Sequence, residues 1–257
     1  MVPNVENAEW EGVNVMKPVD RLRVVSTYTK TVLIFLTIQI SITFVIIMLS
    51  SIIGYYFQGN KESTQSIVAG LFLLIALVIA LLILLVKKIS EKYPLNVVFL
   101  IIYSIFMAIA TAVWDIKLCF LLKLAIFVIS LVLFTSALLI GAAIKSYSVD
   151  HLMNILISLS VTSVVTAVVG SVLFVLKRQY SAIGVYIGVQ LLFFNITILI
   201  SHFTVGKSRY LILYPNYSLA AIILYSIFSS SLSVNTGIWE VYNETENSVI
   251  QFKLNSK

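Results

Sequence analysis

The chain alternates between long apolar runs and short polar links. Each run contains about twenty residues, the length at which a helix crosses the roughly 30 Å hydrocarbon core of a bilayer. A transmembrane β-barrel would instead show short segments in which polar and apolar residues alternate. The pattern therefore predicts an all-α, polytopic membrane protein with one seven-helix bundle at residues 30–233. The predicted spans are residues 31–57, 66–86, 95–114, 119–144, 152–176, 182–205 and 217–233, between polar tails at 1–29 and 234–257.

The composition excludes a soluble globular domain. Hydrophobic residues make up 60% of the chain, charged residues make up 11%, and the mean hydropathy is +1.04. Soluble domains are about half apolar and about a quarter charged. Cys119 is the one cysteine, so neither an intrachain disulfide nor a cysteine metal cluster can form. The N-terminal tail has no apolar core, so we expect no cleavable signal peptide, and no motif calls for a cofactor.

The charge distribution gives an orientation rather than a nucleic-acid site. The net charge is +6, but the basic residues lie in links beside the spans, so we expect no nucleic-acid partner. With the N-terminus in the cytosol, ten Lys and Arg residues fall in the cytosolic segments and four in the short loops on the opposite side. This bias predicts a cytosolic N-terminus and a luminal C-terminus. Asn243, which begins an Asn-Glu-Thr sequence, is then a luminal glycosylation acceptor close to the membrane.

A few polar or small residues inside the spans indicate helix packing. Gln39 and Thr43 are four residues apart, so they share one helix face. We expect both to hydrogen-bond to a neighbouring helix rather than to act in transport. Lys123 lies about one turn inside the fourth span, where we expect its ammonium to reach the lipid headgroups. Gly184 and Gly188 form the Gly-x-x-x-Gly pattern of close helix packing.

Several short motifs occur in the order in which one membrane-protein family has them. They are Leu36, Gln39, Ile40 and Thr43 in the first span, Pro94 and Asn96 at the start of the third, and Tyr217, Leu219, Ala220, Ala221, Leu224 and Tyr225 in the last. In this order and spacing the chain resembles the Bax inhibitor/lifeguard family, and within it the Golgi anti-apoptotic, lifeguard-4-like branch. The resemblance covers the first span, the start of the third and the last two spans.

This resemblance implies a seven-helix protein of the Golgi or endoplasmic reticulum that acts in calcium homeostasis and in the negative regulation of apoptosis. The family's proposed gate is a pair of buried aspartates, which share a proton because two close carboxylates cannot both ionise cheaply. In this chain Ile200 and Ile227 occupy the two aspartate positions. Ser201 replaces the threonine that follows the first aspartate, and His202 fits the next histidine. The proton-sensing gate therefore cannot be transferred to this chain.

Two functions from different classes follow from these observations. In the first, the protein is a channel that lets Ca²⁺ leak along a path without aspartates. The lining of that path would be Gln39, Thr43, Asn195, Thr197, Ser201 and His202. Calcium prefers carboxylate oxygens, yet all eleven acidic residues fall in tails, loops or span edges, which weakens this function.

In the second, the bundle does not conduct and acts as a regulatory protein that binds other membrane proteins. The loss of both aspartates favours this second mechanism, and the resemblance keeps calcium and cell death as its setting. We expect no enzyme, because the chain has no zinc-protease, serine-hydrolase or phosphate-binding motif.

Overall fold

The computed structural model describes residues 18–56, 62–86, 89, 92, 94–114, 118–143, 157, 159–161, 163–165, 168, 181–204 and 216–255. Its long helices are α2 (Pro18–Tyr56), α3 (Glu62–Leu85), α5 (Leu95–Trp114), α6 (Phe120–Ala143), α8 (Ser181–Thr204) and α9 (Tyr217–Asn255). All six contain a stretch that is long and apolar enough to cross a membrane. The described residues hold no strand, so the predicted all-α class is confirmed for this part of the chain.

Two helices extend beyond the spans expected from the sequence. The first, α2, begins at Pro18 within the predicted N-terminal tail, where proline fits the first turn of a helix. The last, α9, runs to Asn255 through the predicted C-terminal tail, and its apolar stretch reaches Val241. No proline follows Tyr217, so the sequence has no proline stop at the expected end. The predicted span 152–176, apart from scattered positions, and the link 205–215 lie outside the described residues.

The direction of α2 and α5 relative to α9 follows from paired contacts. Phe35 stacks on Tyr217 with ring centroids 5.5 Å apart, and Thr43 hydrogen-bonds to Tyr225 further along both helices. Contact positions thus increase together, so α2 and α9 are parallel. The contacts between α5 and α9 follow the same order at Asn96–Tyr217, Tyr103–Ser226 and Thr111–Ser229. These three helices therefore cross the membrane in one direction.

The other two partners of α9 run the opposite way. Gln190 of α8 bonds to Ser231, whereas Tyr186, earlier in α8, lies against Gly237, later in α9. For α6, the antiparallel pairs with α9 are Ser130–Asn235 and Phe134–Phe228. It follows that α6 and α8 are parallel to each other. The end of α6 and the start of α8 therefore lie on opposite sides of the bundle.

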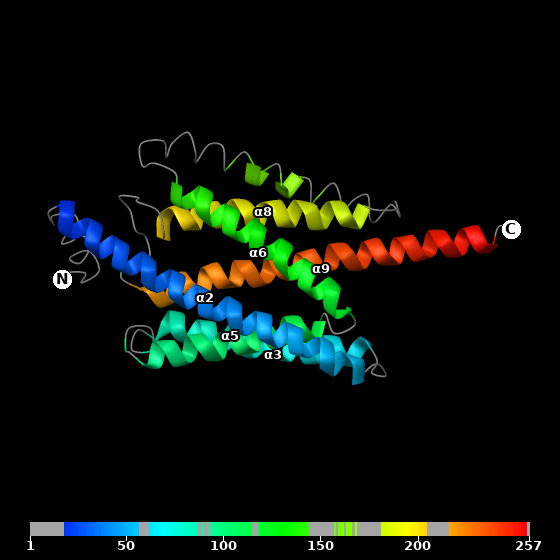
Figure 1. The fold of residues 1–257 in the computed structure, drawn as a ribbon, viewed down its shortest axis with the longest axis horizontal. Coiled ribbons are helices and arrows are strands. Elements are labelled where there is room, and N and C mark those ends of the chain that lie inside the picture. Colours follow the sequence, from blue (N-terminus) through cyan, green and yellow to red (C-terminus); the bar gives the residue numbers. More distant parts are fainter. Residues whose placement is uncertain are drawn as a thin grey trace.

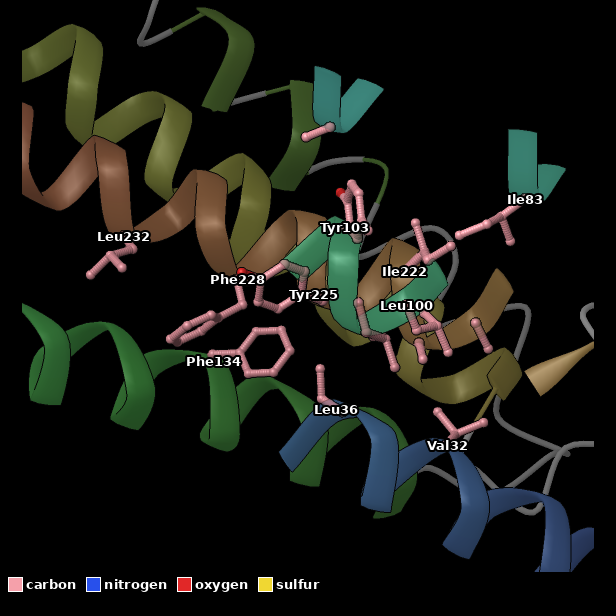
Figure 2. Close-up of a cluster of buried hydrophobic side chains, with 14 of the residues drawn as sticks. Val32, Leu36, Ile83, Leu100, Tyr103, Phe134, Ile222, Tyr225, Phe228 and Leu232 are labelled. Atoms are coloured by element: carbon pink, nitrogen blue, oxygen red, sulfur yellow. The ribbon is translucent and has the colours of Figure 1, made fainter. Parts of the chain in front are cut away.

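The bundle is arranged around α9. In its apolar stretch 67% of the residues are buried, against 22% in α3. Figure 1 shows α9 passing between α8 on one side and α3 and α5 on the other. Figure 2 shows Phe228 of α9 beside Phe134 of α6, and Tyr225 beside Tyr103 of α5. The outer surface of α3 carries exposed leucines, as a lipid-facing helix does: Leu71, Leu74 and Leu77 are all more than half exposed.

Candidate functional site

The start of α9 brings together two of the motifs seen in the sequence. The Asn216 side chain accepts a hydrogen bond from the backbone N–H of Leu219 at 3.1 Å, which caps the helix. One residue later, the Tyr217 hydroxyl accepts a hydrogen bond from the side-chain amide of Asn96, itself fully buried at the start of α5. The Tyr217 ring stacks on Phe35 of α2. This end of the bundle is therefore fixed by one residue from each of three helices.

The middle of α9 is held by a tyrosine with no solvent exposure. The Tyr225 hydroxyl lies 2.7 Å from the Thr43 hydroxyl and donates to the Ser104 carbonyl oxygen at 3.2 Å. Tyr103 meets the Tyr225 ring edge-on at 5.8 Å, and its own hydroxyl lies 2.6 Å from that of Ser226. We call these five residues, Thr43, Tyr103, Ser104, Tyr225 and Ser226, the α2-side network. Packed around it on α9, Ala220, Ala221 and Leu224 are also fully buried.

Gln39 and Thr43 share one buried face of α2, as the sequence predicted. Thr43 is fully buried, and its bond to Tyr225 confirms the predicted hydrogen bond to a neighbouring helix. Gln39 is only 1% exposed, yet neither its amide oxygen nor its amide nitrogen has a hydrogen-bond partner among the described residues. Its predicted interhelical hydrogen bond is therefore not made in this part of the structure.

A second set of polar contacts lies on the other side of α9. Gln190 Nε2 of α8 donates to Ser231 Oγ at 2.7 Å, and Asn235 Nδ2 of α9 donates to Ser130 Oγ of α6 at 2.7 Å. We call these four residues, Ser130, Gln190, Ser231 and Asn235, the α8-side network. This network was not predicted from the sequence, because Asn235 was assigned to the tail and serines are common in helix interfaces. The spacing of Asn235 four residues after Ser231 would have been the signal.

The end of α6 approaches α8 very closely. A Cβ atom at Gly141 would lie 2.4 Å from the Ile198 carbonyl oxygen and 2.8 Å from the Ser201 Cβ. Beside this contact, Ser201 Oγ donates to the Leu138 carbonyl oxygen at 2.7 Å. His202 is 1% exposed, with Nδ1 3.4 Å from the Gly141 carbonyl oxygen. Ser201 and His202 are therefore packed into a tight α6–α8 crossing.

The candidate pore residues from the sequence consequently fall into two groups. Gln39 and Thr43 lie on α2 against the α5 and α9 side, whereas Ser201 and His202 lie on α8 against α6. Asn195 is 5% exposed on α8. The helix α9 contacts both α2 and α8, and its residues Leu224 and Phe228 have no exposed surface.

The two positions that match the family's aspartates are apolar and buried or half-buried. Ile227 is 8% exposed, and Ile200 packs against the main hydrophobic core. The Gln190–Ser231 and Tyr186–Gly237 contacts place Ile227 of α9 near the level of Asn195 of α8. Ile200 is five residues further along α8, which at 1.5 Å per residue is about 7 Å from that level. Within the six apolar stretches that the structure describes, Glu240 near the end of α9 is the only carboxylate. No group of three His, Cys, Asp or Glu side chains able to hold a metal occurs among the described residues.

The expectation that Lys123 reaches the headgroups is wrong. The side chain is only 2% exposed, and Nζ donates to Ser50 Oγ of α2 at 2.9 Å. Lys123 belongs to the buried stripe of α6 that continues through Phe127 and Ser130. These residues are four and seven positions further on, which places them on the same helix face. That face points into the bundle, so the Lys123 side chain is buried there.

Taken together, these described residues offer hydroxyl, amide and carbonyl groups, the imidazole of His202 and the buried amino group of Lys123. Comparisons with known protein families, with characterised proteins and with solved structures find no match to this chain. Neutral oxygen and nitrogen atoms join helices well, but they coordinate a divalent cation less strongly than carboxylates do.

Proposed function

We propose that this protein is an integral membrane regulator of intracellular calcium homeostasis and cell death of the Bax inhibitor/lifeguard type, which acts without conducting ions. It would work by binding other membrane proteins through a stable helical bundle. The biological setting rests on the motif resemblance, in which Asn96 and Tyr217 belong to two separate motifs. Their mutual hydrogen bond supports treating those motifs as parts of one structural unit.

The observation that carries the non-conducting mechanism is the closed packing of α9. Tyr225, Leu224 and Phe228 are fully buried, and aromatic rings from α5 and α6 pack on them. The polar groups beside them are uncharged and largely occupied by bonds between helices. Lys123 of α6 donates to Ser50 of α2, which adds a polar contact between these two helices.

A calcium leak is the second candidate, because polar side chains occur on both sides of α9. The two networks contain nine residues that could interact with a passing ion if the helices separated. This alternative would need α9 to move away from α2 or α8 and so break the Thr43–Tyr225 or Gln190–Ser231 hydrogen bonds.

The helix directions support a seven-span arrangement. Since α2 and α9 are parallel, an odd number of spans lies between them, whereas the described part holds four: α3, α5, α6 and α8. The seventh span expected from the sequence at residues 152–176, most of which lie outside the described part, would make this number odd. With the charge bias, this arrangement gives a cytosolic N-terminus and a luminal C-terminus in the Golgi or endoplasmic reticulum.

The direct test is calcium flux from liposomes that contain the purified, folded protein and a trapped calcium indicator. We expect no flux above that of empty liposomes between about pH 6 and 8, the range in which a histidine titrates. An added ionophore provides the positive control for trapped calcium. A flux that rises or falls across this range would overturn the non-conducting mechanism and favour the leak, with His202 as the residue to substitute.

A further inference from the structure

A small cavity lies where α6, α8 and α9 meet, outside the α2-side network. It leaves about 10 Å³ for the centre of a water molecule, and about 10–15 Å³ is what one water requires. Its apolar wall comes from both α6 and α8 and includes Phe134, Ala137 and Phe193. Its polar groups are Gln190, Thr197 and Ser231. The cavity thus combines the volume of a single water with polar groups from α8 and α9.

One of these groups is a buried acceptor that lacks a donor. Gln190 Nε2 donates to Ser231 Oγ at 2.7 Å, but Gln190 Oε1 is buried and has no hydrogen-bond partner among the described residues. If the amide is turned over, the atoms exchange roles and the unsatisfied group is a donor instead. Either way, one side-chain amide atom of Gln190, which lines the cavity, lacks a partner among the described residues, and leaving a buried group without one is costly.

The other two groups retain hydrogen-bonding capacity. The Thr197 hydroxyl donates to the Phe193 carbonyl oxygen at 2.7 Å, so its oxygen can still accept. Ser231 Oγ accepts from Gln190, so its own proton can still be donated. The cavity therefore presents two acceptors and one donor, and buried waters typically make about three hydrogen bonds.

We infer that this cavity binds one ordered water molecule, which donates to Gln190 Oε1 and Thr197 Oγ1 and accepts from the Ser231 hydroxyl. The water links two turns of α8 to α9, beyond the single direct bond from Gln190 to Ser231. The α8–α9 contact is then hydrated at this cavity.

A double-mutant cycle tests this site in the full-length protein. Ala137→Val fills the cavity, and Gln190→Met removes the amide while keeping a similar shape. If water is bound, Ala137→Val displaces it and leaves the Gln190 amide unsatisfied, a penalty that is absent in the Gln190→Met background. Ala137→Val should therefore lower the melting temperature more in the wild-type background than in the Gln190→Met background, and this difference should be on the order of 4 °C. Any strain from the added methyl groups occurs in both backgrounds and cancels.

Melting temperatures that are additive within about 1 °C would overturn the inference, because a coupling of one hydrogen bond is larger than that. A second measurement does not depend on the variants. In wild-type protein reconstituted in lipid, solid-state NMR should transfer magnetisation from water to the Gln190 side-chain amide, whose signal is identified by its loss in Gln190→Met. A visible Gln190 signal without transfer from water would also overturn the inference.

Discussion

At the scale of single residues, uncharged side chains fix α9 in the bundle. Tyr217, Tyr225 and Ser231 each bond to a different neighbouring helix. In a membrane such bonds contribute modestly, about 0.6 kcal/mol on average and up to about 1.7 kcal/mol, because the separated helices find other partners. These bonds instead determine how the helices are oriented, because each bond can form in only one register of the helix pair. The networks therefore determine which face of α9 meets which neighbour.

The Thr43–Tyr225 pair gives a direct test at this scale. Tyr225→Phe removes the hydroxyl that bonds to Thr43 and Ser104 and leaves the aromatic contacts in place. We expect a loss of about 1 kcal/mol in unfolding free energy, measured by thermal unfolding in detergent. A cycle with Thr43→Val should show a coupling energy of about 0.6–1.7 kcal/mol. Strict additivity of the two substitutions would contradict the bond.

Some of these residues could be predicted from sequence and others could not. The four-residue spacing of Gln39 and Thr43 correctly indicated a shared buried face, since helix periodicity determines it. The environment of Lys123 was not predictable from its distance to the helix end, because that distance says nothing about which face of α6 turns inward. The stripe through Phe127 and Ser130 held that information.

At the scale of elements, glycine decides how closely two helices approach. Gly141 lets the end of α6 lie against the backbone of α8 at Ile198. This contact positions Ser201 to bond to the Leu138 carbonyl oxygen. The sequence pattern singled out Gly184 and Gly188 within α8, whereas Gly141, which lies against the α8 backbone, belongs to α6. A sequence pattern within one helix cannot show which neighbour it meets.

Gly141→Ala should separate α6 from α8, because the new methyl carbon would lie 2.4 Å from the Ile198 carbonyl oxygen, a backbone atom. We expect a loss of about 1–3 kcal/mol in unfolding free energy, typical of overpacking. Gly70→Ala is the matched control, since a Cβ at Gly70 on α3 has no atom within 4 Å. That control should be neutral or stabilise the protein by up to about 1 kcal/mol. Equal effects of the two substitutions on thermal unfolding would refute the close contact.

The helices themselves were largely predictable, whereas their ends were not. Long apolar runs reveal spans because crossing the hydrocarbon core demands them. The start of α2 and the end of α9 lie in polar sequence, where no membrane constraint stops a helix. Hydropathy therefore placed the start of α2 too late and the end of α9 too early. Because the end of α9 was placed too early, Asn235 was assigned to the tail, and its contact with Ser130 of α6 was not predicted.

At the scale of the whole molecule, the helix directions predict where the two termini lie. Because α2 and α9 are parallel, the N-terminal end of α2 and the C-terminal end of α9 lie on opposite sides of the bundle, as Figure 1 shows. A glycosylation sequon on a flexible extension after Lys257 should therefore be modified in cells, and one placed before the first residue should not. Modification at both ends, or only at the N-terminus, would contradict the proposed orientation.

The main proposal is that no continuous path for water and ions runs along α9. It can be tested by placing single cysteines at Ala221, Ser226 and Ser229, where the substitution changes little volume, and by adding a cationic thiol reagent to both sides of proteoliposomes. Ala221 and Ser229 are buried, and Ser226 bonds to Tyr103. The exposed native Cys119 serves as the internal reference.

Intact-mass analysis then counts the adducts. For a closed bundle, we expect each folded variant to gain the same number of adducts as the wild-type chain, and one more only after denaturation in SDS. An additional adduct on the folded protein at any of these positions would mean that an aqueous path runs along α9, and would contradict a closed bundle.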